Sequence, residues 1–152
     1  MNITFESIGH VECPTIHMND APFQSIIANN VVGKLIIREK YSQGLQDLNG
    51  FSHIIVTFYF HESKEYTLLT KPKLDSIERG VFAVRTPNRP NPIGISILRV
   101  LDIKNNVIKV QGLDMISKTP ILDIKPYIHV FDTRMESTNG WIGPFLEELE
   151  MN

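Results

Sequence analysis

The sequence predicts a mainly β protein, a single antiparallel β-barrel with a few short helices. Short runs of β-branched and aromatic residues recur along the 152 residues at roughly regular spacing, with turn residues between them. These runs do not alternate with helical segments as in βαβ units, which favours antiparallel pairing. A hydrophobic content of 42% and a charged content of 21% are ordinary for a globular domain, which we expect to span residues 1–152.

The first half of the chain predicts three strands and one helical turn. Alternating apolar residues predict a strand over residues 3–12. Residues 13–30 are expected to form a long loop, because prolines and paired polar residues leave no sustained helical or strand periodicity. A strand over residues 31–38 and a helical turn over 41–48, closed by an Asn-Gly pair, come next. Residues 53–60 give the clearest strand, since β-branched and aromatic residues fill it. Ile54, Val56, Phe58 and Phe60 share one face of this strand, which we expect to face the core.

The second half predicts a charged connection and then further strands. Residues 61–79 carry many charged side chains and are expected to be exposed. Apolar runs predict strands over residues 81–84, 95–102, 107–111 and 121–128. Asn105 and Asn106 mark a β-hairpin between two of these runs, since Asn tolerates positive φ. Residues 141–150 predict a short acidic helix.

Charge is modest overall but unevenly distributed. The net charge is −2, yet residues 64–125 hold 11 Lys/Arg against 6 Asp/Glu, a local charge of +5. Residues 1–63 (3 against 6) and 126–152 (1 against 5) are acidic, at −3 and −4. The net charge argues against a protein that coats nucleic acid generically. The basic middle is compatible with an anionic ligand or RNA, although a solvated mixed surface gives the same excess.

Cysteine content and hydropathy limit the environment. A lone cysteine, Cys13, excludes an intramolecular disulfide and a cysteine zinc cluster, so we expect no metal and a cytoplasmic location. The first residues lack the pattern of a signal peptide, and no apolar run is long enough for a membrane helix. The phosphate-loop, zinc-helix and nucleophile-elbow motifs are absent from the sequence, which removes those enzyme classes in their usual form.

The segment Arg85–Gly94, RTPNRPNPIG, is the stretch least like a filler loop. Its three prolines fix their own φ and hold the preceding residues away from helix, so the loop should be stiff. A stiff loop that presents Arg and Asn suits a polar ligand, because little entropy remains to be lost on binding. Arg85 or Arg89 can clamp a carboxylate or phosphate in bidentate fashion. The alternative is a rigid turn whose arginines face solvent.

Two other places carry candidate chemistry. His61 and Glu62 directly follow the clearest strand, where side chains point into a barrel mouth, although a lone His there is also typical of a structural hydrogen-bonder. In an extended segment Asp123 and Lys125 project from one face about 7 Å apart, and Tyr127 continues this row unless Pro126 bends the strand. A functional polar row and a structural Asp–Lys ion pair both remain open.

These stretches together resemble the TsaA-like family, whose characterised members are S-adenosylmethionine-dependent tRNA methyltransferases of the TrmO type. GVFAVRTPNRPNPIGIS (residues 80–96) is similar to the family's GVFATRSPxRPNPIGxS, and TPILDIKPYI (119–128) to its GTPxxDIKPYxP. IGHVECP near the start, Pro22-Phe23-Gln24 and the run over residues 44–61 occur in the expected order. The resemblance therefore covers residues from about 7 to 132.

The resemblance implies a β-barrel homodimer that binds S-adenosyl-L-methionine near the barrel end and methylates N6 of threonylcarbamoyladenosine beside the tRNA anticodon. The cofactor-binding residues that it implies are Gln24, His61, Glu62, Arg89, Met115, Ile116, Ser117 and Lys118. The pocket residues that it implies are Arg85, Asn91, Lys125 and Tyr127. The attacking nitrogen must lose a proton, and the candidate bases are Asp123 first and His61 second.

Three departures from the family pattern keep other functions open. Phe23 stands where the family has Arg, and Ser117-Lys118 replaces Asp-Gly. A cation near a sulfonium weakens binding unless Lys118 points outward. The sequence also lacks the C-terminal extension of longer members. The alternatives are a non-catalytic cofactor- or RNA-binding regulatory module and a methyltransferase with a different substrate.

Overall fold

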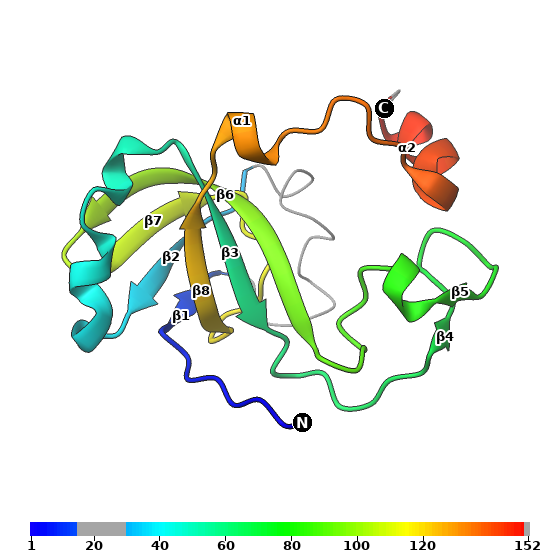
Figure 1. The fold of residues 1–152 in the computed structure, drawn as a ribbon, viewed down its shortest axis with the longest axis horizontal. Helices are drawn as coiled ribbons and strands as arrows, with labels where there is room; N and C mark the ends of the chain where they lie inside the picture. The colour runs from blue at the N-terminus through cyan, green and yellow to red at the C-terminus, as the bar shows by residue number, and fades with distance from the viewer. Residues whose placement is uncertain (15–29, 151–152) are drawn as a thin grey trace.

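Six antiparallel strands close into a barrel in the computed structural model, which describes residues 1–14 and 30–150 (Figure 1). In order around the barrel the strands are β1 (Gly9–Glu12), β2 (Val32–Ile37), β7 (Val107–Gln111), β6 (Ile93–Lys104), β3 (His53–Tyr59) and β8 (Pro120–Pro126). All six neighbouring pairs are antiparallel. The predicted fold class is therefore confirmed.

Short helices and a small second sheet decorate the barrel. The helices are η2 (Glu39–Leu45), η3 (Leu48–Gly50), η4 (Val81–Ala83), α1 (His129–Asp132), η5 (Gly140–Ile142) and α2 (Gly143–Glu150). The second sheet is the pair β4 (Leu69–Thr70) and β5 (Arg79–Gly80). The predicted hairpin joins β6 to β7, where Asn105 has a φ of 56°. The predicted acidic helix is also present, as α2. No helix in the described residues is long and apolar enough to cross a membrane.

Two strand predictions were wrong in part. The opening strand was expected over residues 3–12 but begins at Gly9. Before that point Ile8 still makes backbone bonds to Ile121 and Arg38, whereas Glu6 is held by its side chain, to Arg38 at 2.8 Å and to Tyr41 at 3.0 Å. The strand expected over residues 81–84 is not formed, because residues 81–83 form the 3₁₀ helix η4. The chain turns back there through the bond from the Val84 amide to the Val81 carbonyl.

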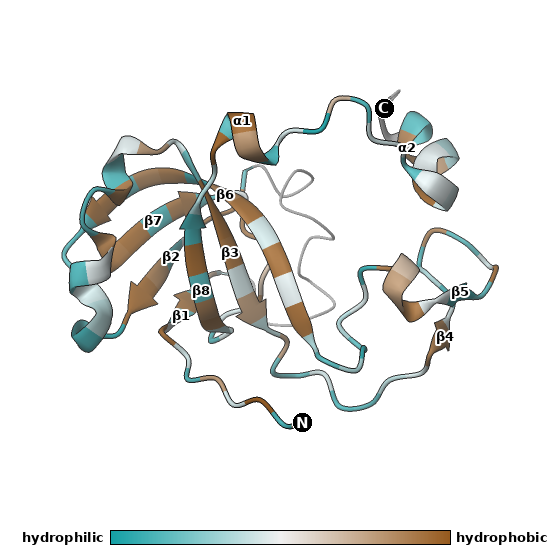
Figure 2. Cartoon of the chain, in the orientation of Figure 1, coloured by the Kyte–Doolittle hydropathy of each residue, from teal (hydrophilic) through white to brown (hydrophobic). Residues whose placement is uncertain are grey.

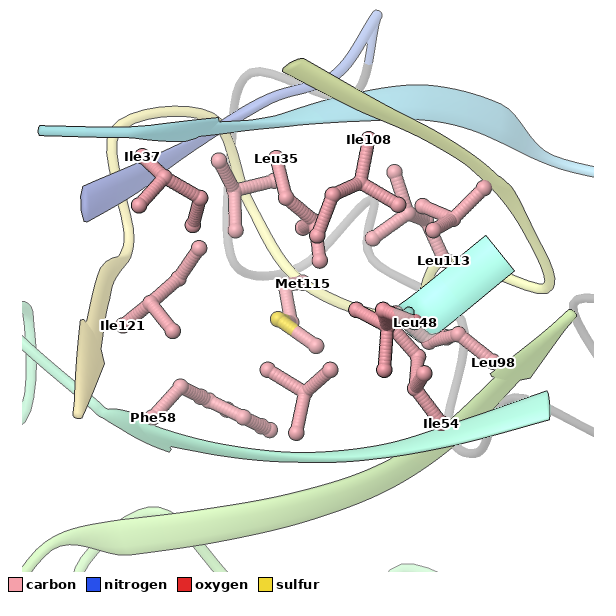
Figure 3. Packing of buried hydrophobic residues seen from close by; sticks show 13 residues of the cluster. Leu35, Ile37, Leu48, Ile54, Phe58, Leu98, Ile108, Leu113, Met115 and Ile121 are labelled. Carbon is pink, nitrogen blue, oxygen red and sulfur yellow. The ribbon is translucent and has the colours of Figure 1, made fainter. Parts of the chain in front are cut away.

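The inward side chains of the strands form the core of the barrel (Figure 3). The predicted core face of β3 is confirmed, because Ile54, Val56 and Phe58 are buried and Phe60 packs against the same cluster. Met115 lies in the middle of this cluster (Figure 3). The functional surfaces must therefore be sought at the ends and on the outside of the barrel.

The outer face of β6 is unusually apolar (Figure 2). Ile93, Ile95 and Ile97 point outward with exposed fractions of 40%, 49% and 44%. Gly94 and Ser96 occupy inward positions between them. The buried Ser96 hydroxyl donates a hydrogen bond of 2.5 Å to Asp114, which offsets the cost of its burial. Three exposed isoleucines in a row on one strand form a contiguous apolar surface, the kind that is found at contact sites.

Residues 61–92 leave the barrel at the end of β3 and return at the start of β6, forming what we call the arm (Figure 1). The arm carries β4, β5 and η4 and ends with the proline-rich loop Arg85–Gly94. Helix α2 lies beside the arm and away from the barrel (Figure 1). The predicted exposed connection is thus a small structured unit of its own.

Substitution Gly94→Ala should destabilise the fold. A Cβ at this position would lie 2.3 Å from Cζ of Phe58 and 2.8 Å from Cζ of Phe60, and the Phe58 ring is held in the core. Overpacking of this kind costs about 1–3 kcal/mol, which lowers the melting temperature by roughly 2–4 °C per kcal/mol. Gly44→Ala is the control, because a Cβ there meets nothing within 4 Å. Equal melting temperatures for the two variants would contradict this account.

Candidate functional site

The proline-rich loop closes onto the end of β3. The Phe60 amide donates to the Pro92 carbonyl at 2.8 Å, and Tyr59 pairs with Ile93 across the ladder. The hydroxyl of Ser63 donates to the Asn88 side chain at 2.9 Å, which ties the segment after β3 to the middle of the loop. The structure therefore brings His61 and Glu62 together with the loop, as the sequence analysis expected.

Arg89 holds the loop in shape. Its Nη1 donates to the Val84 carbonyl at 2.8 Å and to the Thr86 carbonyl at 3.3 Å. These bonds span the loop from its first residues to its middle, adding to the stiffness that the prolines impose. Arg85 and Asn91 lie exposed on the same loop. The loop thus presents polar side chains on a backbone that is already ordered.

His61 supplies a buried nitrogen beside this loop. Its Nδ1 is inaccessible to solvent and has no hydrogen-bond partner among the described residues. Native proteins satisfy most such atoms, so the hydrogen-bond environment of this nitrogen is incomplete within the described residues. The neighbouring Glu62 is exposed and adds a carboxylate at the same place. No cluster of three metal-ligating residues occurs in the described ranges 1–14 and 30–150.

The turn over residues 116–119 is fixed against β1. The Lys118 amide donates to the Val11 carbonyl at 2.7 Å, and the Cys13 amide donates to the Ser117 hydroxyl at 3.4 Å. Lys118 has a left-handed φ of 71°, a conformation that favours glycine. Its side chain is exposed.

Met115 and Ile116 offer only their backbone to a ligand. Their side chains are buried, at 2% and 8% exposure. Next to them an open hollow of about 570 Å³ is lined by His10, Glu12, Cys13, Pro14, Gly33, Lys34, Ser117 and Lys118. A second hollow, between η2 and the β6–β7 hairpin, is lined by Glu39, Ser42, Gln43, Asn105 and Asn106 and contains no predicted site residue. The hollow beside Ser117 is therefore the one that borders the predicted site.

Asp123 and Lys125 form an ion pair on the outside of β8. Lys125 Nζ lies 2.7 Å from Asp123 Oδ2, with both side chains substantially exposed. The hydrogen bond that Lys125 donates to this carboxylate, followed by the charge of the carboxylate, raises the pKa of Lys125. The prediction that both project from one face is confirmed. The structural alternative, an Asp–Lys ion pair, is therefore present. It uses the same two residues that the functional alternative, a polar row, would use.

Tyr127 lies apart from the proline-rich loop. Its amide donates to the His53 carbonyl at the start of β3, whereas His61 follows the end of that strand. His61 lies eight positions after His53, a separation of about 26 Å along an extended chain. The Tyr127 hydroxyl instead bonds Thr133 at 3.1 Å, next to α1. The expected row of Asp123, Lys125 and Tyr127 therefore runs away from His61.

One predicted residue lies outside the described part of the chain, and three residues near the loop were not predicted. Gln24, predicted to bind the cofactor, lies outside the described residues. Sequence reasoning missed Ser63 and Asn88, although the polar NRPNP stretch drew attention to the loop. It also missed Trp141, whose indole nitrogen donates to the Ala83 carbonyl at 2.8 Å. A contact between residues 58 positions apart leaves no local signal in the sequence.

Comparison with known proteins places these motifs in a family. The family model for the tRNA-methyltransferase O N-terminal domain matches residues 10–133. A probable S-adenosyl-L-methionine-binding protein of Pyrococcus abyssi is 38% identical over 148 residues, which cover 97% of this chain and 80% of the relative. The human tRNA (adenine(37)-N6)-methyltransferase is 34% identical over 139 residues, which cover 87% of this chain and 32% of that enzyme.

A solved structure agrees with the fold. The crystal structure of TrmO from Pseudomonas aeruginosa superposes with a TM-score of 0.80 at 28% identity. The match covers 94% of this chain and 64% of that one. The chain thus spans slightly less than two thirds of the bacterial TrmO chain and about a third of the human enzyme.

Substitution Arg89→Lys should loosen the proline-rich loop. Both bonds come from one nitrogen, Nη1, and the shorter lysine side chain ends in an ammonium that does not occupy the position of this nitrogen. Bonds from a charged donor contribute about 1.5–3 kcal/mol each when well buried. Because Arg89 is half-buried, we expect a loss of about 1–2 kcal/mol in the free energy of unfolding, measured in urea. Arg99→Lys, at an exposed position on β6, is the control. A loss no larger than that of the control would show that these two bonds contribute little.

Proposed function

The chain belongs to the tRNA-methyltransferase O family, and on that premise we propose that it is an S-adenosylmethionine-dependent tRNA methyltransferase. The observation that carries the proposal is the closure of the loop Arg85–Gly94 onto the end of β3, beside the unpartnered nitrogen of His61. A stiff polar loop and an orphan buried nitrogen are what a preorganised ligand site requires. The proposed reaction belongs in the cytoplasm, where a lone thiol stays reduced.

The residues at this end of β3 fit S-adenosylmethionine. His61 is partly exposed, so its imidazole can bond a polar group of the cofactor, and the carboxylate of Glu62 can offset its sulfonium charge. We propose that Asn91 and Arg85 contact its polar groups from the loop. The backbone of the turn over residues 116–119 would form the opposite wall, with Gln24 as a further contact. The bound cofactor would supply an activated methyl group.

The protein's own part in the reaction is positioning and proton removal. The site must align the attacking nitrogen with the methyl group and exclude water. We propose N6 of threonylcarbamoyladenosine in tRNA as the attacking nitrogen. Its proton requires a base, for which Asp123 is the first candidate and His61 the second. Asp123 is held by Lys125 as an ion pair, whereas His61 stands directly beside the loop. Lys125 and Tyr127 would then contact the RNA on the outer face of β8.

A cofactor-binding module without catalysis is the second candidate function. Relatives of comparable length carry names that state only S-adenosyl-L-methionine binding. This module would regulate a partner protein or RNA and would keep the same cofactor contacts. A methyltransferase with another substrate is the variant of the first proposal that the replacement of Asp-Gly by Ser117-Lys118 permits.

We also propose that two copies of the chain pair through the outer face of β6. Ile93, Ile95 and Ile97 lie exposed there, and their ladder neighbours on β3 include Ile55 and Tyr59. An apolar surface of this kind suits an isologous interface, in which the same patch of each copy meets the other. Proline-rich loops of both copies would then lie near the interface, since the loop runs directly into β6.

Cofactor binding and methyl transfer test the function. Calorimetry should detect S-adenosylmethionine binding, and His61→Ala should weaken it about tenfold, the effect of one lost hydrogen bond of about 1.4 kcal/mol. His129→Ala, at the other end of the barrel, is the control.

Asp123→Asn should slow single-turnover methylation of tRNA by about 10²-fold or more if Asp123 is the base. An unchanged rate would leave His61 as the candidate.

The substrate needs a separate measurement. Mass spectrometry of tRNA nucleosides from cells with and without the gene should show loss of the methylated threonylcarbamoyladenosine. An unchanged nucleoside profile together with cofactor binding would favour a different substrate or the non-catalytic module. Failure of the native protein to bind the cofactor would reject both candidate functions.

Substitution Ile95→Lys should disrupt the proposed dimer. It places a charge in the centre of the isoleucine row, where burial without a partner is costly. We expect the dissociation constant to rise by about 10²-fold or more, measured by sedimentation velocity, while the barrel stays folded. Val32→Lys is the matched control, because Val32 is an exposed apolar residue on the outer face of β2, at 38%. A native protein that sediments as a monomer at micromolar concentration would overturn the proposal.

A further inference from the structure

The C-terminal segment docks on the arm through one aromatic residue. Trp141, in η5, donates its indole N–H to the Ala83 carbonyl at 2.8 Å. The guanidinium of Arg79 lies 5.1 Å from the centre of the same indole ring, within the range of a cation–π contact. Phe145 of α2 packs edge-on against Trp141 at 6.3 Å. The helix at the end of the chain is thus joined to β5 and η4.

The Arg79 side chain is held from two sides. Its Nη2 bonds the carboxylate of Asp75 at 2.6 Å, and this bond is the largest cause that lowers the pKa of Asp75. The carboxylate therefore remains charged, and the ion pair intact, throughout the neutral range. The opposite contact of the guanidinium is the Trp141 ring. Arg79 consequently links the turn around Asp75 to the C-terminal segment.

The docking point lies immediately before the proline-rich loop. Trp141 holds the carbonyl of Ala83, and the next carbonyl along the chain, that of Val84, accepts the bond from Arg89. One peptide unit therefore separates the contact of the C-terminal segment from the bonds that shape the loop. The arm otherwise contains a ladder of two residue pairs, so its own secondary structure gives little rigidity.

Trp141 lies beyond the part of the chain that the family model matches, residues 10–133, whereas its partners Arg79 and Ala83 lie within it. We propose that Trp141 and Arg79 form a brace through which the C-terminal segment positions the Arg85–Gly94 loop for its ligand. Trp141 is then a positioning residue and makes no contact with the reacting atoms. The identity of the ligand, S-adenosylmethionine, rests on the proposed function, but the mechanical part of the inference does not.

Amide hydrogen exchange tests the brace without any cofactor. Trp141→Phe keeps an aromatic ring but removes the indole donor, and Arg79→Gln removes the cation while the indole remains. In both variants we expect the amides of residues 81–94 to exchange about fivefold to tenfold faster, with the amides of β3 unchanged as proof of an intact barrel. The control is Phe131→Leu, which alters an exposed aromatic residue of α1, at 65%. Exchange at the native rate in both brace variants would overturn the inference.

Calorimetry and kinetics then test the link to the ligand. Trp141→Phe should weaken S-adenosylmethionine binding about fivefold and raise its KM, while the single-turnover rate at saturating cofactor stays native. This split distinguishes a positioning residue from a general loss of stability, which would reduce the amount of active protein instead. Unchanged cofactor affinity together with faster exchange would overturn the claim that the brace serves the ligand site. Failure of the native protein to bind the cofactor would reject the proposed function alone.

Discussion

The pairing of β3 with β6 is the constraint on which the rest of the structure depends. Seven consecutive residue pairs join the two strands, and Gly94 allows the Phe58 ring to lie directly against the β6 backbone. This pairing fixes where β3 ends and where the arm must return. Every element of the candidate site is placed by reference to that point: the residues after β3, the proline-rich loop that closes onto Phe60, and the isoleucine row that continues from the loop.

Because the barrel is filled, its interior has a structural role and its periphery carries the candidate functional groups. Because large side chains, Met115 among them, occupy the interior, the barrel acts as a rigid scaffold and not as a container. The candidate functional side chains lie at the strand ends and in the arm, where loops can carry polar groups without destabilising the core. Stiffness that a core element would gain by packing is gained in the loop from prolines and from the bonds of Arg89 to backbone carbonyls.

The sequence was informative wherever local periodicity reflects burial. The alternation of Ile54, Val56 and Phe58 predicted β3, and the Asn pair predicted the hairpin. Prediction failed where a distant partner decides the conformation. Residues 81–84 have strand-like composition but lack a neighbouring strand to extend the ladder, so they form a helical turn. Tyr127 lies in the same motif as Asp123, yet the direction of β8 carries it to the other end of the barrel. Trp141 is set by a tertiary contact that periodicity cannot encode.

The closure of the barrel is uneven around its circumference. β1 and β8 share two residue pairs, the shortest of the six ladders, and one pair involves Pro120, whose nitrogen cannot donate to a ladder. Backbone bonds of Ile8 and Val11 continue the contact on either side of these pairs. Local opening of a protein begins where few backbone bonds must break, so we expect this seam to separate before the pairing of β3 with β6 does. The seam ends at the turn that contains Ser117 and Lys118. The turn that we propose as one wall of the ligand site therefore adjoins the shortest ladder of the barrel, whereas the proline-rich loop adjoins the longest.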